Sequence, residues 1–135
     1  MDAIEQIRQM LQSYPLLSYH QDGNTFIVAP ASANGFSASL TFTGDGFVVS
    51  FDGWHEHFES EVDAFNCFVF GLSDQCRLKV FRSGMTDYRW TLEHLTEEGW
   101  HEESTTRLLF FPFWRQRHII YRQNTIIENG GVSSM

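Results

Sequence analysis

Apolar and polar side chains alternate strictly from residue 36 to residue 43. The apolar face carries Phe36, Ala38, Leu40 and Phe42, and the other face carries Ser37, Ser39, Thr41 and Thr43. A period of two is the pattern of a β-strand with one buried and one solvated face. Gly44-Asp45-Gly46 then supplies the positive φ angles of a tight turn, and the apolar residues of the next run, 47–51, alternate again. The sequence therefore predicts an antiparallel hairpin over residues 36–52.

Two other segments have helical spacing, with apolar side chains three or four residues apart. The first carries Ile4, Ile7, Leu11 and Tyr14, and the proline at position 15 ends it. The second, over residues 60–72, carries Val62, Phe65, Val69 and Leu72. Acidic residues near its start interact favourably with the positive end of the helix dipole. Because this second helix is apolar on other faces as well, we expect it to be buried between layers.

The other patterns indicate strands. One short strand over residues 25–29 precedes the hairpin, and an antiparallel meander follows the second helix, with strands at residues 77–82, 88–95, 100–111 and 117–122. The predicted fold class is α+β, with two helices packed on antiparallel sheet in the order α-β-β-β-α-β-β-β-β.

We expect a single domain over residues 1–128 and a flexible C-terminal tail over residues 129–135. Two similar triplets, Asp2-Ala3-Ile4 and Asp63-Ala64-Phe65, stand at the starts of the two predicted helices. They leave open a duplication of one α-β-β-β unit.

The charge of the chain is unevenly distributed along the sequence. Residues 1–70 carry nine acidic side chains and one basic side chain, Arg8, whereas residues 71–135 carry eight of each, so the whole net charge of −8 falls in the first half. Nucleic acid is an unfavourable partner for such a chain, because phosphate binding depends on Lys and Arg. The sequence does not begin like a signal peptide and has no apolar run long enough to span a membrane, so we expect a cytoplasmic protein with no membrane contact. In that compartment we expect Cys67 and Cys76 to be free thiols.

The chain is rich in aromatic residues, with 13 Phe, 4 Trp and 4 Tyr. So many rings are difficult to bury in one small core, so some should line a cavity or a subunit interface. The segment Phe110-Phe111-Pro112-Phe113-Trp114 has two interpretations. It is either a core strand beneath the helices or part of a dimer seam or ligand pocket.

One segment has the residue types of a metal site. If a strand runs through residues 54–61, His55 and His57 point to the same side, and Glu59 or Glu61 can complete a divalent metal site. This His-x-His spacing with a Glu four residues later resembles the first half of the cupin motif. The second cupin motif is missing here, and a predicted helix begins where a cupin would continue with strands. The alternative is a solvated strand end.

Other catalytic patterns are absent from the sequence. Gly35-Phe36-Ser37-Ala38-Ser39 does not complete the G-x-S-x-G pattern of a nucleophile elbow, and no glycine-rich phosphate loop occurs. Adjacent acids such as Glu97-Glu98 are typical of hydrated turns. The sequence predicts no cofactor.

Two functional hypotheses follow. The first is a non-enzymatic acidic binding protein, forming a homodimer, that engages a protein partner through its N-terminal half; the candidate partner face is Asp52, Glu56, Glu59, Glu61 and Asp63. Toxin immunity proteins use acidic surfaces in this way, and secretion chaperones are similar in size and acidity. The alternative is a domain that binds a small apolar ligand, or a metal-dependent enzyme, with an aromatic-lined pocket near His55 and His57; the candidate pocket residues are Trp54, Trp90, Trp100, Trp114 and His94.

Overall fold

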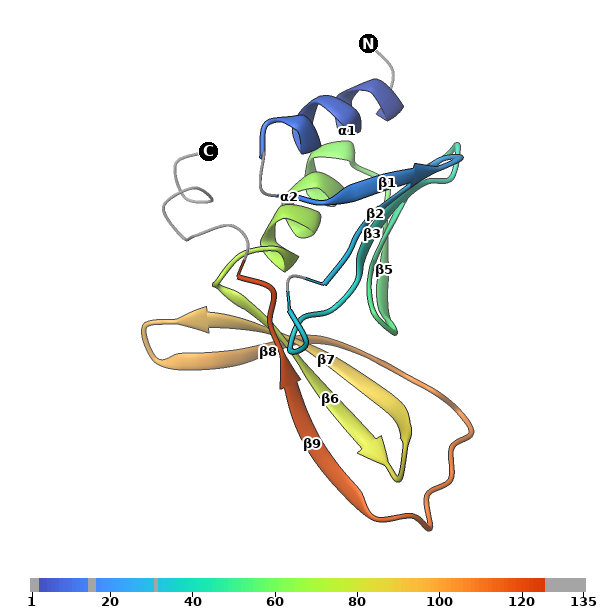
Figure 1. The fold of residues 1–135 in the computed structure, drawn as a ribbon, viewed down its shortest axis with the longest axis vertical. Helices are drawn as coiled ribbons and strands as arrows, with labels where there is room; N and C mark the ends of the chain where they lie inside the picture. Colours follow the sequence, from blue (N-terminus) through green and yellow to red (C-terminus); the bar gives the residue numbers. More distant parts are fainter. Residues whose placement is uncertain (1–2, 15–16, 31, 126–135) are drawn as a thin grey trace.

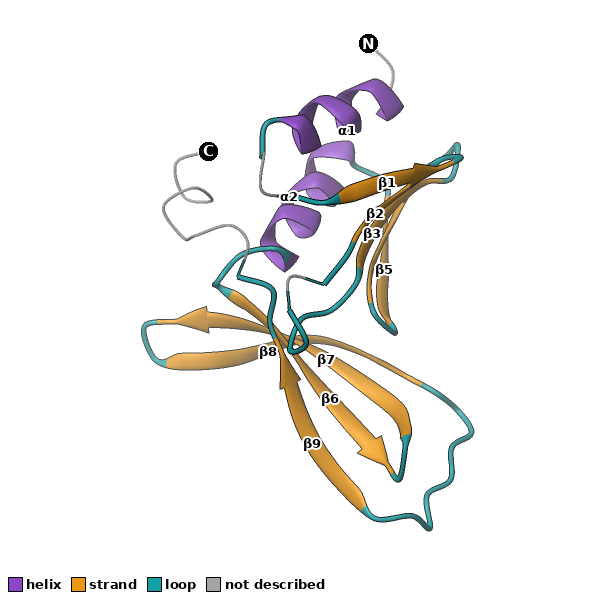
Figure 2. Ribbon diagram, viewed as in Figure 1, coloured by secondary structure: helices purple, strands orange, loops and turns teal. Residues whose placement is uncertain are grey.

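The computed structural model describes residues 3–14, 17–30 and 32–125. It contains two helices and two antiparallel sheets (Figures 1 and 2). The elements are α1 (Ala3–Gln12), β1 (Tyr19–Asp22), β2 (Thr25–Val28), β3 (Ala38–Phe42), β4 (Phe47–Phe51), β5 (Trp54–Phe58), α2 (Glu61–Gly71), β6 (Cys76–Ser83), β7 (Thr86–Thr96), β8 (Gly99–Arg107) and β9 (Arg117–Arg122). The predicted α+β class and the order of helix, strands, helix, strands are confirmed. The first group of strands also contains β1 and β5, which the prediction did not count. The predicted tail, 129–135, lies outside the described residues.

The first sheet is a five-stranded meander in which neighbouring strands follow one another in the chain, from β1 to β5. The predicted hairpin is confirmed as β3 and β4, with Ala38 opposite Phe51 and Phe42 opposite Phe47. The strand β1 was not predicted because its sequence, Tyr-His-Gln-Asp, is polar and lacks alternation; backbone pairing with β2 holds it at the sheet edge. A tight turn through Asp52, at φ 51°, leads from β4 into β5.

Both helices lie against the first sheet (Figure 1). The side chain of Ser60 caps α2 by accepting a hydrogen bond from the backbone N–H of Asp63. The buried side of α2 includes Ala64 and Phe68. Val62, which we predicted on the apolar stripe of this helix, is 65% exposed. The backbone of α2 approaches the sheet closely at Gly71, where a Cβ atom would lie 2.0 Å from Cζ of Phe51. The close approach explains a glycine inside this helix.

The second sheet has the strand order β8-β7-β6-β9. The predicted meander is therefore wrong at its last step, because β9 crosses over to pair with β6 instead of β8. The third predicted strand also ends earlier, at Arg107, and residues 108–116 form a long connection that makes this crossover. The two halves of the chain thus differ in strand number and topology, which gives the suggested duplication no support.

The second sheet projects away from the helices and the first sheet (Figure 2). Trp54 joins the two sheets at their junction. It is 1% exposed, its ring stacks on Phe51 with centroids 5.1 Å apart, and its indole N–H donates to Oγ of Ser104 at 2.9 Å. Neither of the described helices is long and apolar enough to cross a membrane.

Candidate functional site

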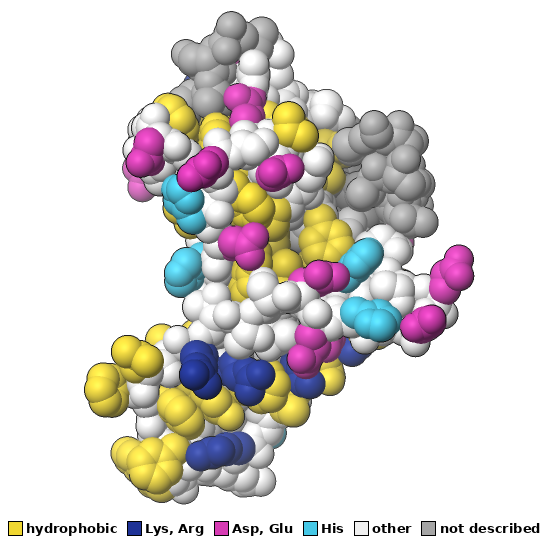
Figure 3. Space-filling view, turned by 180° about the vertical axis from the view of Figure 1, so that it is seen from behind, with side chains coloured by type: hydrophobic (Ala, Val, Ile, Leu, Met, Phe, Trp, Pro, Cys, Tyr) yellow, Lys and Arg dark blue, Asp and Glu magenta, His cyan; other side chains and the backbone are white. Residues whose placement is uncertain are grey.

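A groove of about 370 Å³ lies where β5, α2, β7 and β8 meet. It is lined by Glu56, Phe58, Asn66, Cys67, Phe70, Leu92, His94 and Glu103. In the view of Figure 3, hydrophobic side chains are exposed in the upper half of the molecule, and acidic and histidine side chains lie around them. We call the groove lined by these eight residues the acidic groove.

The chemistry of the acidic groove combines an apolar floor with a negative margin. Phe58 and Phe70 contribute rings, and none of the lining side chains is Lys or Arg. The carboxylates come from different sheets, Glu56 from β5 and Glu103 from β8. His94 stands between floor and margin, because its ring meets Phe70 edge to face at 5.4 Å and its Nδ1 lies 3.4 Å from Oε1 of Glu103. The groove suits an apolar group that carries a positive charge.

Cys67 shares the groove with His94 and Glu103, the residue types of a cysteine nucleophile and its base. Burial, with a smaller contribution from the charge of Glu56, raises the pKa of the Cys67 thiol to about 12. The thiol is therefore protonated at neutral pH, whereas a cysteine nucleophile requires a lowered pKa. This arrangement favours binding over nucleophilic catalysis.

The structure separates the five acidic residues of the predicted partner face. Asp52 is engaged within the fold, because one carboxylate oxygen accepts from the backbone N–H of Ser37 at 2.9 Å and the other pairs with Arg122 at 2.6 Å. Glu61 faces the Gln6 amide of α1. Of the five, Glu56 is the one that lines the acidic groove, while Glu59 and Asp63 are exposed outside it.

Glu103 was missed as a member of this acidic surface. It belongs to the half of the chain whose charges cancel, and only the packing of the second sheet on β5 and α2 brings it near Glu56. No local sequence signal links these two positions.

The four tryptophans of the predicted pocket occupy different environments. Trp54 and Trp90 are buried, and the ring of Trp90 lies against Gly53. Trp100 is half-buried with the guanidinium of Arg77 4.4 Å from its ring centroid, and Trp114 is 70% exposed. The structure therefore does not gather them around one pocket. His94, the remaining candidate, lines the acidic groove without them.

The predicted metal ligands are not gathered either. His55 and His57 are exposed at alternate positions of β5, as the strand interpretation required. Within the described part of the chain, no group of three or more His, Cys, Asp or Glu side chains is arranged to hold a metal ion. The geometry offers these two histidines no third ligand among those residues.

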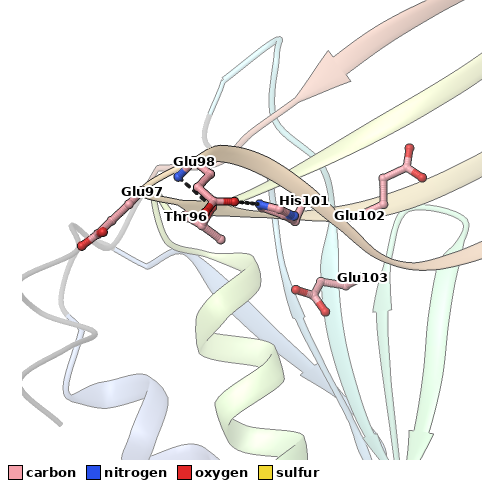
Figure 4. Close-up of a pocket in the computed structure, with 6 residues that line it drawn as sticks. All are labelled: Thr96, Glu97, Glu98, His101, Glu102 and Glu103. Carbon is pink, nitrogen blue, oxygen red and sulfur yellow. Dashed lines mark hydrogen bonds and ion pairs between the residues drawn. The ribbon is translucent and has the colours of Figure 1, made fainter.

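A second hollow of about 590 Å³ lies on the β7–β8 hairpin, lined by Thr96, Glu97, Glu98, His101, Glu102 and Glu103 (Figure 4). The backbone N–H of Glu98 donates to Oγ1 of Thr96 at 3.2 Å, and the Glu98 carboxylate lies 4.0 Å from Nε2 of His101. Figure 4 shows the other carboxylates pointing in different directions. Glu103 lines both hollows, so the second hollow adjoins the acidic groove.

The aromatic segment Phe110–Trp114 is not a core strand, and that interpretation was wrong. It belongs to the connection between β8 and β9, where Phe110 is 90% exposed. Pro112 lacks a backbone N–H for strand pairing, and β9 fills the edge of the sheet beside β6. The segment is instead a projecting apolar surface.

Comparisons with known proteins give this chain no relative. No family model, no curated protein and no solved structure matches it.

Proposed function

We propose that this protein is a non-enzymatic binding protein whose acidic groove takes a basic, partly apolar segment of a protein partner. One observation carries the proposal: Glu56 and Glu103 lie on the margin of a groove with an apolar floor and no lining Lys or Arg. The predicted homodimer and cytoplasmic location remain part of this proposal.

Lys and Arg side chains match both parts of the groove. Their aliphatic stems can lie on Phe58, Phe70 and Leu92 while the charged ends reach the carboxylates. Charge pairs of this kind contribute mainly to specificity and to the rate of association. The volume of about 370 Å³ is near the lower end of ligand pockets, which span about 300–1,000 Å³. It therefore fits one or two side chains of a longer segment.

A peptide segment is favoured over a small apolar amine by the extent of the negative margin. Glu97 and Glu98 lie beyond the apolar floor, in the second hollow, which shares Glu103 with the groove, whereas Glu102 pairs with Lys79 at 3.4 Å. A small ligand would contact only the groove, whereas an extended chain can place further basic residues beside the hairpin.

Fluorescence polarisation with two labelled peptides tests the proposal. One peptide alternates Lys and Leu, and the other carries Glu in place of each Lys. We expect the wild-type protein to bind the Lys peptide and not the Glu peptide. Replacing both margin carboxylates, by Glu56→Gln with Glu103→Gln, should weaken binding about tenfold or more.

The matched control is the double variant Glu59→Gln with Asp22→Asn, because neither residue lines the groove or the second hollow. It removes the same net charge from two exposed positions outside the groove. We expect it to bind the Lys peptide nearly as well as wild type. Equal weakening in both double variants would mean that net charge alone attracts the peptide, and the proposal would then fail.

A further inference from the structure

The geometry points to a second copy of this chain as the partner of the acidic groove, with a basic aromatic tip of one copy inserted into the groove of the other. The tip, which we call the distal tip, consists of the β6–β7 turn at Gly84 and Met85 together with residues 107–117. This inference rests on the proposed function, since it names the segment that the groove binds.

The distal tip presents apolar side chains to solvent. The most exposed are Met85, Leu109, Phe110, Phe113 and Trp114, with exposures from 63% to 91%. Large exposed apolar side chains concentrated in one part of a molecule mark an interaction site. Aromatic residues, Met and Arg are the types enriched in protein interfaces.

Hydrogen bonds hold the backbone of the distal tip in place. Ser83 donates its hydroxyl to the carbonyl of Pro112, and the N–H of Gly84 donates to the carbonyl of Gln116 at 2.8 Å. The rings of Tyr88 and Phe111 stack with centroids 4.0 Å apart. The exposed side chains therefore project from an ordered platform, which lowers the entropy lost on binding.

The distal tip also carries positive charge that the fold does not neutralise. Five of the nine basic residues form ion pairs with carboxylates: Arg8, Arg77, Lys79, Arg82 and Arg122. Among the described residues, no carboxylate pairs with the other four, which are Arg89, Arg107, Arg115 and Arg117. All four lie in the distal tip or directly beside it.

Two of these arginines are placed unfavourably for an isolated monomer. Arg89 and Arg107 are directly opposite on β7 and β8, an arrangement in which like charges repel. The Nε atom of Arg89 is also buried without a hydrogen-bond partner. The guanidinium of Arg89 lies over the ring of Phe81, 4.6 Å from its centroid. An acidic surface supplied from outside the monomer would provide the carboxylate that both arginines lack.

The acidic groove is the complement of this tip within the same chain. It offers carboxylates for the arginines and an apolar floor for the rings. The face in Figure 3 shows the acidic and histidine-rich region above and the apolar and basic region below. Two copies related by a two-fold axis and placed antiparallel would each insert a tip into the other's groove, forming a closed, self-complementary interface. Pairing of two tips is disfavoured, because it would bring four unneutralised arginines against four others.

Analytical ultracentrifugation tests this arrangement with two variants. The tip variant is Phe110→Ser with Trp114→Ser, and the groove variant is Glu56→Gln with Glu103→Gln. Each should weaken self-association of the wild-type dimer about tenfold or more. All four positions are exposed or line an open groove, so circular dichroism should show unchanged folding. Val62→Ser, which removes an exposed apolar side chain from α2, is the control and should leave the dimer intact.

Mixing the two variants is the decisive measurement. A tip variant keeps an intact groove and a groove variant keeps an intact tip, so the mixture should form a heterodimer through one intact tip–groove contact. A wild-type chain that stays monomeric at high concentration would overturn the inference. So would a dimer that the tip variant disrupts and the groove variant does not, which would indicate tip-to-tip pairing.

Comparing self-association with peptide binding separates this inference from the function on which it rests. A monomeric wild-type protein that still binds the Lys peptide would retain the proposed function and overturn the self-docking inference. Failure of both peptide binding and self-association would overturn both. Sedimentation of the monomer with vesicles of phosphatidylcholine and phosphatidylglycerol, lost in the tip variant, would instead assign the distal tip to an anionic membrane surface.

Discussion

Asp52 and Arg122, seventy residues apart in the chain, form an ion pair of 2.6 Å that ties the β4–β5 turn to the last strand of the second sheet. Arg122 also reaches Asp87 at 3.1 Å, and Asp87 pairs with Arg82 at 2.6 Å. The four side chains are each no more than 24% exposed. This network connects the two sheets by charge, where Trp54 connects them by packing.

Replacing the turn carboxylate should therefore destabilise the fold. Asp52→Asn keeps a residue type that tolerates the positive φ of this turn but removes the charge facing Arg122. We expect the free energy of unfolding to fall by about 1.5–3 kcal/mol, the range for hydrogen bonds to charged groups. Urea unfolding measures it. Glu59→Gln, at an exposed acid outside the network, should change stability by less than about 0.5 kcal/mol; an equal loss in both variants would contradict the structural role of Asp52.

The indole of Trp54 and the hydroxyl of Ser104 form the polar contact across the sheet junction, at 2.9 Å. Ser104→Ala leaves a buried N–H without its partner, which costs about 1–3 kcal/mol. Thermal or urea unfolding of Ser104→Ala, Trp54→Phe and the double variant forms a double-mutant cycle. We expect a coupling energy of at least about 0.5 kcal/mol. Additive losses would show that this hydrogen bond does not contribute to stability.

Close packing of α2 on the first sheet should make Gly71 intolerant of a side chain. A Cβ atom there would lie 2.0 Å from the ring of Phe51, so Gly71→Ala requires the ring or the helix to move. We expect a loss of about 1–3 kcal/mol in unfolding free energy, typical of an overpacked core. The loss caused by Gly71→Ala should be smaller in a protein that already carries Phe51→Leu than in the wild type. No interaction between the two changes would contradict the packing shown here.

Stability should fall at alkaline pH because of the buried thiols. Burial raises the pKa of Cys67 from 9.0 to about 12 and raises that of Cys76 as well. The unfolded chain therefore loses these protons at lower pH than the folded chain, and the contribution of Cys67, complete below about pH 9, is lost between about pH 9 and 12. Urea unfolding over this pH range measures the decline. Cys67→Ala should make it shallower, and an unchanged slope would show that Cys67 does not contribute.

Thiol labelling provides an independent check on the same group. With the pKa of Cys67 at about 12, the native protein should react slowly with a disulfide reagent near neutral pH and rapidly once unfolded in urea. Because the charge of Glu56 contributes to the raised pKa, Glu56→Gln should increase the native labelling rate at a fixed alkaline pH. Glu59→Gln should leave that rate unchanged. Rapid labelling of the native wild-type protein at neutral pH would contradict the protonated state.

Local patterns determined those elements whose structure depends on near neighbours. The period of two around Gly44-Asp45-Gly46 predicted the β3–β4 hairpin, and helical spacing predicted α1 and α2. The polar strand β1 escaped prediction because its neighbour, not its own pattern, holds it in the sheet. The exposed Val62 shows the same limit, since a helical stripe predicts an apolar side but not which edge of it faces the core.

The sequence by itself determined the α+β class, the order of helices and strands and the net charge of −8. Only the tertiary structure decided that β9 pairs with β6, that Asp52 is neutralised by Arg122 and that Glu56 shares a groove with Glu103. It also placed Phe110 on the surface. The physical reason is that alternation and helical spacing act between near neighbours, whereas these pairings depend on how distant segments pack, which a charge count along the chain does not record.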